Sequence, residues 1–184
     1  MAQVTIRPAT VDDLTEVARI HVASWQAAYR GQLPDAYLDG LSSSEREAGW
    51  RSRVQNAAPR QELWVMERDA EVLGVAALGP SRDADAEEGW GEIYAIYLRP
   101  DCWGQGVGRE LLVQASRRLT NLGFKRSFLW VLESNERARR FYERAGWRAT
   151  VTTRVEQGPE FEFREVRYER DTLSLSSPRV APAP

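Results

Sequence analysis

Three glycines at alternate positions form the part of the sequence whose residue types could do chemistry. Gly104, Gly106 and Gly108 follow an apolar stretch, residues 93–98, and lead into an apolar pattern with helical spacing that begins at Val107. Glycine has no Cβ and tolerates a positive φ, and the first N–H groups of a helix have no partner within that helix. The spacing therefore predicts a strand, a loop and a helix start that could hold an anion on main-chain N–H groups.

Two common phosphate-binding loops do not fit these glycines. No Gly-Lys-Ser/Thr ending follows them, as a nucleoside-triphosphate loop would require. The spacing Gly-x-Gly-x-Gly also differs from the dinucleotide-binding pattern, and no strand-end acid stands in the expected place. We therefore expect a different anion, with a connector that binds no ligand as the alternative interpretation.

A second pattern joins an asparagine and a tyrosine on one predicted helix. Asn135 and Tyr142 are seven residues apart, which is two helical turns, so both side chains lie on the same helix face. Gly146 would end that helix. Both side chains could line one cleft, and the alternative is that Tyr142 is only a packed aromatic residue.

Both segments resemble the GCN5-related N-acetyltransferase (GNAT) family. The acetyl-CoA loop of that family is usually written Arg/Gln-x-x-Gly-x-Gly/Ala, and Trp103, Gly106 and Gly108 stand at its three places. Trp103 departs from the polar residue that is usual there. Residues 135–147 resemble the second motif of the family, Asn-x-x-Ala-x-x-x-Tyr-x-x-x-Gly-Phe, and the resemblance as a whole spans about residues 3–168.

The resemblance implies that acetyl-CoA binds as a co-substrate and that no metal is needed. The main chain of residues 96–98 would pair with the pantetheine arm like an added strand. Because Trp103 offers no polar contact, backbone amides would hold the diphosphate. The implied cofactor-binding residues are Ile96, Tyr97, Leu98, Trp103, Gly104, Gln105, Gly106, Val107, Gly108, Arg109, Asn135 and Tyr142.

Acetyl transfer to an amine needs a base and a proton for the leaving thiolate. An alkyl ammonium has a pKa of about 10, so about one molecule in a thousand is nucleophilic at neutral pH. The resemblance places the Tyr142 hydroxyl at the thioester sulfur, as the general acid or as a group that only positions the sulfur. Glu92 stands where one branch of the family has its catalytic glutamate, although Glu87 and Glu88 compete for that role. No Cys-His or Ser-His pair is available for an acyl-enzyme, which favours direct transfer.

The acceptor half of the site is less specific. Residues 25–42 resemble the segment that walls the acceptor pocket in the family, so Trp25, Tyr29 and Leu33 are the expected substrate-binding residues, with ordinary core packing as the alternative. The acidic loop at residues 80–89 could attract a cationic amine. His21 is interpreted as a packed core histidine, with a catalytic base as the alternative. A small amine and a peptide N-terminus both remain open as acceptors.

The resemblance and the element pattern predict a single α/β (α+β) domain over residues 1–169 and a flexible tail over residues 170–184. The family fold is a mixed, mostly antiparallel sheet of six or seven strands, with helices on both faces and splayed central strands. Expected strands cover residues 3–8, 63–67, 72–78, 92–98, 128–132, 147–155 and 161–168. Expected helices begin at Thr10, Pro34, Ser42, Val107 and Asn135.

Composition narrows the class of protein further. The chain has 184 residues and a net charge of −2, so it has room for one full core and no broad basic field for nucleic acid. No apolar run approaches the length of a membrane span, and the start lacks the features of a signal peptide. A single cysteine, Cys102, suits a reducing compartment, so we expect a cytoplasmic protein. A homodimer, which is common in the family, remains possible. A non-catalytic acyl-CoA sensor remains the alternative function.

Overall fold

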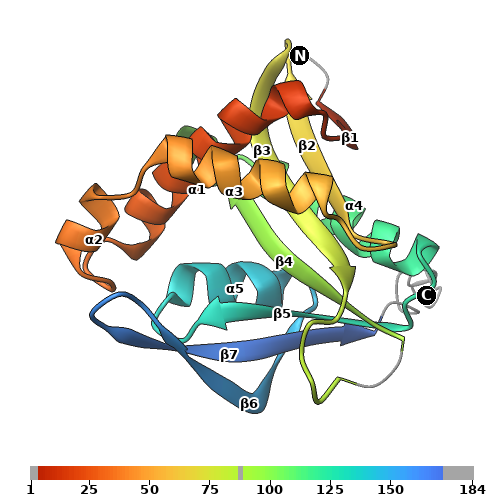
Figure 1. The fold of residues 1–184 in the computed structure, drawn as a ribbon. Helices are drawn as coiled ribbons and strands as arrows, with labels where there is room; N and C mark the ends of the chain where they lie inside the picture. The colour runs from red at the N-terminus through yellow and green to blue at the C-terminus, as the bar shows by residue number, and fades with distance from the viewer. Residues whose placement is uncertain (1–3, 87–88, 172–184) are drawn as a thin grey trace, which may run out of the picture.

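One seven-stranded sheet organises the protein. The computed structural model describes residues 4–86 and 89–171. Figure 1 shows the strands in the order β1-β2-β3-β4-β5-β7-β6, and only β4 and β5 run parallel. The bounds are β1 Thr5–Pro8, β2 Glu62–Arg68, β3 Glu71–Pro80, β4 Trp90–Leu98, β5 Arg126–Leu132, β6 Arg148–Gln157 and β7 Glu162–Asp171. The mixed, mostly antiparallel sheet predicted from the sequence is confirmed.

Helices cover both faces of this sheet. In Figure 1, α1 and α3 cross one face and α4 lies on the other. The helices are α1 Leu14–Tyr29, α2 Asp35–Asp39, α3 Ser43–Gln55, α4 Val107–Asn121 and α5 Glu136–Arg144, with single 3-10 turns at Val11–Asp13 and Pro100–Cys102. Val17 of α1 packs with Val65 and Val75 on one face, whereas Leu111 of α4 packs with Met66 and Leu129 on the other. The sheet is therefore the middle layer of three.

The two parallel strands separate soon after they meet. β4 pairs with β5 only at Trp90, Gly91 and Glu92, while its pairing with β3 continues to Leu98. The register between β3 and β4 shifts at Ala77/Leu78, where β4 has one extra residue, Tyr94, and such a bulge beside the point of separation bends the strand that carries it. The β5-facing edge of β4 is thus left without strand partners within the described residues after Glu92. This is the splay that the resemblance implied.

Several boundaries differ from the sequence-based expectations. The last strand runs to Asp171, and Arg170 and Asp171 pair with β5, so these two residues belong to the sheet and not to the expected tail. Residues 172–184, the rest of that tail, lie outside the described residues, as do Glu87 and Glu88. The second helix begins at Asp35 and not at Pro34, which precedes it as its N-cap. Across the described ranges, no helix has the length and apolarity to cross a membrane.

His21 is part of the core between α1, α3 and β4. Its side chain stacks on Tyr97 with ring centroids 4.6 Å apart, and its Nδ1 accepts a hydrogen bond of 3.3 Å from the indole N–H of Trp50. Nε2 is buried and has no hydrogen-bond partner among the described residues. Burial, supported by the charges of Arg46 and Arg53, lowers the pKa of His21 to about 3. The histidine is therefore neutral in the folded protein.

We expect this neutral histidine to make the protein less stable as the pH falls from about 6.5 to about 4. In that window the unfolded chain binds a proton at His21 and the folded chain does not, so the free energy of unfolding decreases by about 1.4 kcal/mol per pH unit from this group. His21→Asn keeps an oxygen that can accept the Trp50 hydrogen bond but has no group that titrates. Urea unfolding at several pH values should give a shallower pH dependence for the variant, and equal slopes would contradict the account.

Candidate active site

A cavity of about 500 Å³ opens where β4 and β5 separate. Its walls come from α1, β4, the loop after β4, α4, β5, α5 and β7. The sequence-predicted site residues that line it are Trp25, Tyr29, Ile96, Tyr97, Leu98, Trp103, Gly104, Gly106, Gly108, Arg109, Asn135 and Tyr142. The predicted residues outside the lining are Leu33, Glu92, Gln105 and Val107. Residues of the glycine loop and the pair Asn135 and Tyr142 therefore line the same cavity.

The glycine loop forms one end of the cavity, next to the start of α4. Gly104 and Gly106 have φ values of +78° and +85°, and a Cβ built on either would meet no protein atom within 4 Å. Gly106 is the N-cap of α4, and no side chain caps this helix end. Gly108 has another function, because a Cβ there would lie 3.0 Å from Leu98 Cδ1. Two glycines therefore shape an open loop over free N–H groups, and the third lets helix and strand approach.

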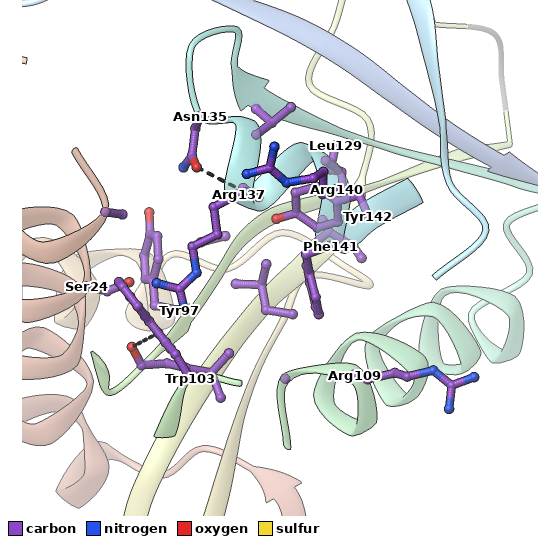
Figure 2. Close-up of a pocket in the computed structure, with 18 of the residues that line it drawn as sticks. Ser24, Tyr97, Trp103, Arg109, Leu129, Asn135, Arg137, Arg140, Phe141 and Tyr142 are labelled. Atoms are coloured by element: carbon purple, nitrogen blue, oxygen red, sulfur yellow. Dashed lines mark hydrogen bonds between the residues drawn. The ribbon is translucent and has the colours of Figure 1, made fainter. Parts of the chain in front are cut away.

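Trp103, the departure from the usual motif, packs beside this loop. Its indole N–H donates a hydrogen bond of 3.1 Å to the carbonyl of Leu98, and the Arg137 guanidinium carbon lies 3.9 Å from the centre of the ring. Figure 2 shows Arg137 reaching from α5 toward Trp103. A tryptophan face attracts a guanidinium in this geometry. Trp103 therefore holds a cation near the loop where the family usually places a polar side chain.

Four arginines line this end of the cavity, and in Figure 2 the side chain of Arg109 points away from Arg137, Arg140 and Tyr142. Arg109 comes from α4, and Arg137, Arg140 and Arg144 come from α5. Sequence reasoning missed the three on α5. Their spacing of three, four and seven residues places them on one helix face, and this is the signal that could have found them. With the amino end of α4, the three arginines of α5 can hold an anion of several charges.

Tyr142 and Asn135 lie between the two ends of the cavity. The Tyr142 side chain is 8% exposed, and its ring packs against Trp147 and Tyr168. Burial raises the pKa of Tyr142, so its hydroxyl stays protonated at neutral pH and can donate a hydrogen bond. The Asn135 side-chain oxygen accepts a hydrogen bond of 3.0 Å from the amide of Ala138, the dashed line in Figure 2, and so caps α5. Two residues predicted to share a cleft do so.

Glu92 lies near the start of β4 and is 1% exposed. One carboxylate oxygen accepts hydrogen bonds from the Arg82 backbone N–H at 3.0 Å and Nε at 3.2 Å, and the other lies 2.5 Å from Arg82 Nη2. Both oxygens are therefore engaged by one residue. To take a proton from an amine in the cavity, Glu92 would need a relay or a movement of Arg82.

Aromatic side chains and one carboxylate form the opposite end of the cavity. Trp25 and Tyr29 of α1 meet edge to face at 5.1 Å, and Tyr97 and Trp130 also line this space. Glu165 of β7 lines the cavity with them, and its Oε2 accepts a hydrogen bond of 2.8 Å from Arg154 Nε and lies 2.7 Å from Arg154 Nη2 in an ion pair. Burial raises the pKa of Glu165, although the ion pair with Arg154 opposes this shift.

The remaining predicted residues have packing or local roles. Leu33 is 6% exposed and packs with Leu38 and Leu132 behind the cavity wall. Val107 is 5% exposed at the start of α4. The Gln105 side-chain amide donates a hydrogen bond of 2.7 Å to the carbonyl of Asp101.

The acids of the 80–89 loop that the structure describes are paired with cations. Asp83 accepts a hydrogen bond of 3.0 Å from the Trp130 indole and lies within 4 Å of Arg154 and Arg167. Asp85 forms an ion pair of 3.0 Å with Arg167. These contacts attach the loop to the sheet, and they neutralise most of the field expected to attract a cationic amine.

Comparisons with known proteins agree with this geometry. The family model described as Acetyltransferase (GNAT) family matches residues 17–147. An uncharacterized N-acetyltransferase of Bacillus subtilis, YuaI, is 37% identical over 133 residues, which is 72% of this chain and 73% of the relative. An uncharacterized N-acetyltransferase of Archaeoglobus fulgidus is 30% identical over 74% of this chain and 88% of its own length.

Two solved structures share the fold at lower identity. The Salmonella typhimurium protein yncA, solved with its cofactor acetyl-CoA, has a TM-score of 0.68, 20% identity and 98% coverage of both chains. The PaiA N-acetyltransferase of Thermoplasma acidophilum, in complex with coenzyme A, has a TM-score of 0.68 and 20% identity, covering 92% of this chain and 99% of its own. The family match spans the glycine loop, Asn135 and Tyr142, so it includes the described cavity lining except Glu165. The chain belongs to the GNAT family of N-acetyltransferases.

Proposed function

We propose that this protein transfers an acetyl group directly from acetyl-CoA to a primary amine. The observation that carries the proposal is the cavity between β4 and β5, which joins the open glycine loop to the buried hydroxyl of Tyr142. Family membership supports acetyl transfer as the reaction class. Both a small molecule and a peptide N-terminus have the required amine.

The cavity fits coenzyme A at its positive end. The space around Gly104 and Gly106 leaves the N–H groups at the start of α4 accessible, and the three cavity-lining arginines of α5 balance phosphate charge. The unpaired edge of residues 96–98 on β4 can pair with the amide groups of the pantetheine arm. The bound acetyl-CoA supplies the acetyl group as a thioester. Two structural neighbours contain acetyl-CoA or coenzyme A, which supports this assignment.

Two residues are assigned to proton transfer. Tyr142 donates its hydroxyl hydrogen to the sulfur, either as the general acid or as a hydrogen bond that holds the sulfur in place. Glu92 is kept as the base expected from the resemblance, working through a relay because Arg82 occupies its carboxylate. The protein itself forms no covalent intermediate in this proposal.

A cytoplasmic location is part of the proposal. Cys102 is free and only 7% exposed, and burial raises the pKa of its thiol, so the thiol is poorly suited to exchange. The chain's single cysteine therefore does not depend on an oxidising compartment. Fractionation of cells that produce the protein at native levels would test this location.

Release of the coenzyme A thiol tests the function. The purified protein is mixed with acetyl-CoA and, separately, with primary amines, amino acids and short peptides, and thiol is measured with a chromogenic disulfide. We expect thiol release above the acceptor-free rate with at least one class, together with an acetylated product in the mass spectrum. Coenzyme A binding by calorimetry without turnover on any of these acceptors would favour a non-catalytic acyl-CoA sensor.

A further inference from the structure

We propose that the acceptor is a small organic cation, a primary amine on an apolar or aromatic body without a carboxylate beside the amine, and that Glu165 binds its ammonium group. This inference rests on the proposed function and names its substrate class. It also replaces Glu92 by Glu165 as the group that takes the amine proton, because Arg82 engages both oxygens of Glu92 and Glu92 does not line the cavity. Neither the glycine loop nor the asparagine–tyrosine motif contains any information on the acceptor.

The positively and the negatively charged side chains of the cavity lining come from different elements of the fold. Within the described residues, the charged side chains of the lining are four arginines and one glutamate, Glu165. The arginines come from α4 and α5, the elements next to the glycine loop, while Glu165 comes from β7. Burial raises the pKa values of Tyr29 and Tyr97; the negative charge of Glu165 adds to both rises, whereas the positive charges of Arg53 and Arg46 oppose the rise at Tyr97. Within the described lining, Glu165 is therefore the one negative charge that a cation at the aromatic end would meet.

One oxygen of Glu165 is available to a ligand. Arg154 contacts Oε2 alone, with a hydrogen bond of 2.8 Å from Nε and an ion-pair contact of 2.7 Å from Nη2, and no described residue donates a hydrogen bond to Oε1. The Glu165 side chain is 16% exposed. Arg154 also contacts Glu156 and Asp83, and Asp83 has a second cation in Arg167, so Arg154 is shared between Glu165 and Glu156 and is not the partner of Glu165 alone. Glu165 thus retains negative charge toward the cavity.

Aromatic side chains surround the space next to this carboxylate. Trp25, Tyr29, Tyr97 and Trp130 line it. Aromatic faces attract an ammonium ion and also bury an apolar body. An amine that bears a carboxylate next to its nitrogen would bring a second negative charge to Glu165, which opposes binding.

The acceptor end is closed on the side away from the glycine loop. Leu33 and Leu38, in the α1–α2 segment, pack with Leu132 at the end of β5. Tyr37 meets Phe161 of the β6–β7 hairpin with ring centroids 4.9 Å apart. In Figure 1, α2 and the tip of that hairpin approach each other. Because these segments touch behind the cavity, the acceptor site fits a small molecule better than an extended peptide.

Glu165 can make such an amine reactive. The ammonium group gives one proton to Glu165 Oε1, and the free amine nitrogen then bonds to the acetyl carbon. The carbon–sulfur bond breaks with its electron pair on sulfur, the nitrogen loses a second proton, and the sulfur gains one to leave as a thiol. Glu165 releases its proton to solvent, so the products are an amide, coenzyme A and one proton.

Matched acceptors test the substrate class. Rates of thiol release are compared for 2-phenylethylamine, for L-phenylalanine, which adds a carboxylate beside the same amine, and for a peptide that begins with phenylalanine. We expect kcat/KM for the amine to exceed that of the other two by about tenfold or more. If the amino acid or the peptide is acetylated equally well or better, the proposed function stands and the substrate class is wrong.

Two glutamates that contact Arg154 provide a matched pair of variants. Glu165→Gln should lower kcat/KM for 2-phenylethylamine about 100-fold, because it removes the charge and the proton acceptor. Glu156→Gln also removes a carboxylate 3.0 Å from Arg154 Nε, but Glu156 does not line the cavity, so the rate should stay within about threefold. Unchanged coenzyme A affinity in calorimetry would show that both variants retain the fold. An unchanged rate in Glu165→Gln would overturn the assignment.

A non-reactive cation separates this inference from the proposed function. Trimethyl(2-phenylethyl)ammonium cannot be acetylated, so its binding to the coenzyme A-loaded protein does not require turnover. We expect it to bind about tenfold more tightly than neutral 2-phenylethanol, and Glu165→Gln should remove that difference. Equal binding of cation and alcohol by the wild type would contradict the cation site even if acetyl transfer is found.

Discussion

Tyr142→Phe is expected to lower kcat about 100-fold while the affinity for coenzyme A stays nearly unchanged. The substitution removes only a hydroxyl group, and the ring can keep its contacts with Trp147 and Tyr168. Because burial keeps this hydroxyl protonated, it is a reliable hydrogen-bond donor to the sulfur that leaves. Thiol release with the best acceptor of the panel measures kcat, and calorimetry measures affinity.

Tyr168→Phe is the matched control for this substitution. Tyr168 packs against Tyr142 with ring centroids 6.0 Å apart. Outside the cavity, its hydroxyl donates a hydrogen bond to Glu143 and accepts one from Arg139. The control should lose about 1 kcal/mol of stability and keep its kcat. If Tyr142→Phe turns over as fast as wild type, Tyr142 does not assist the leaving sulfur. A loss below tenfold would favour positioning of the sulfur over proton donation.

Gly106→Ala is expected to weaken coenzyme A binding by about tenfold or more, because it perturbs the free N–H groups that hold the diphosphate. Gly106 has a φ of +85°, where alanine costs about 1–2 kcal/mol. An added Cβ would point into the open space of the loop and meet no protein atom within 4 Å. The loop must therefore either shift or place a methyl group where the ligand needs room.

Gly123→Ala provides the same strain at the other end of α4. Gly123 has a φ of +89° and equally open surroundings. The two variants should lose similar thermal stability without ligand, but only Gly106→Ala should lose affinity for coenzyme A in calorimetry. Equal affinities in the two variants would mean that the amino end of α4 does not hold the ligand.

Features that depend on local sequence were predictable. Gly104 and Gly106 adopt positive φ values, which glycine allows at little cost, and Asn135 and Tyr142 share a helix face because of the helical repeat. The continuous apolar run at residues 72–78 and the hairpin turns also placed the strands of the sheet to within a few residues. In these cases a short segment determines its own geometry.

Features that depend on contacts between distant segments were not predictable from the residues alone. The Arg82 side chain reaches across ten positions to engage Glu92, and Arg137 stacks on Trp103 from another helix. Glu165 enters the cavity because β7 pairs with β5 next to the gap, and strand alternation does not reveal which side faces a ligand. Aromatic residues such as Trp25 occur both in cores and in pockets, so only the fold distinguishes these two roles.

The most direct test of the account is a crystal structure of the protein with bound coenzyme A. We expect the diphosphate on the N–H groups of residues 104–108, the pantetheine arm along residues 96–98 of β4, and the sulfur within hydrogen-bonding distance of the Tyr142 hydroxyl. Coenzyme A bound elsewhere on the protein, or a Tyr142 hydroxyl directed away from the sulfur, would contradict the central claim.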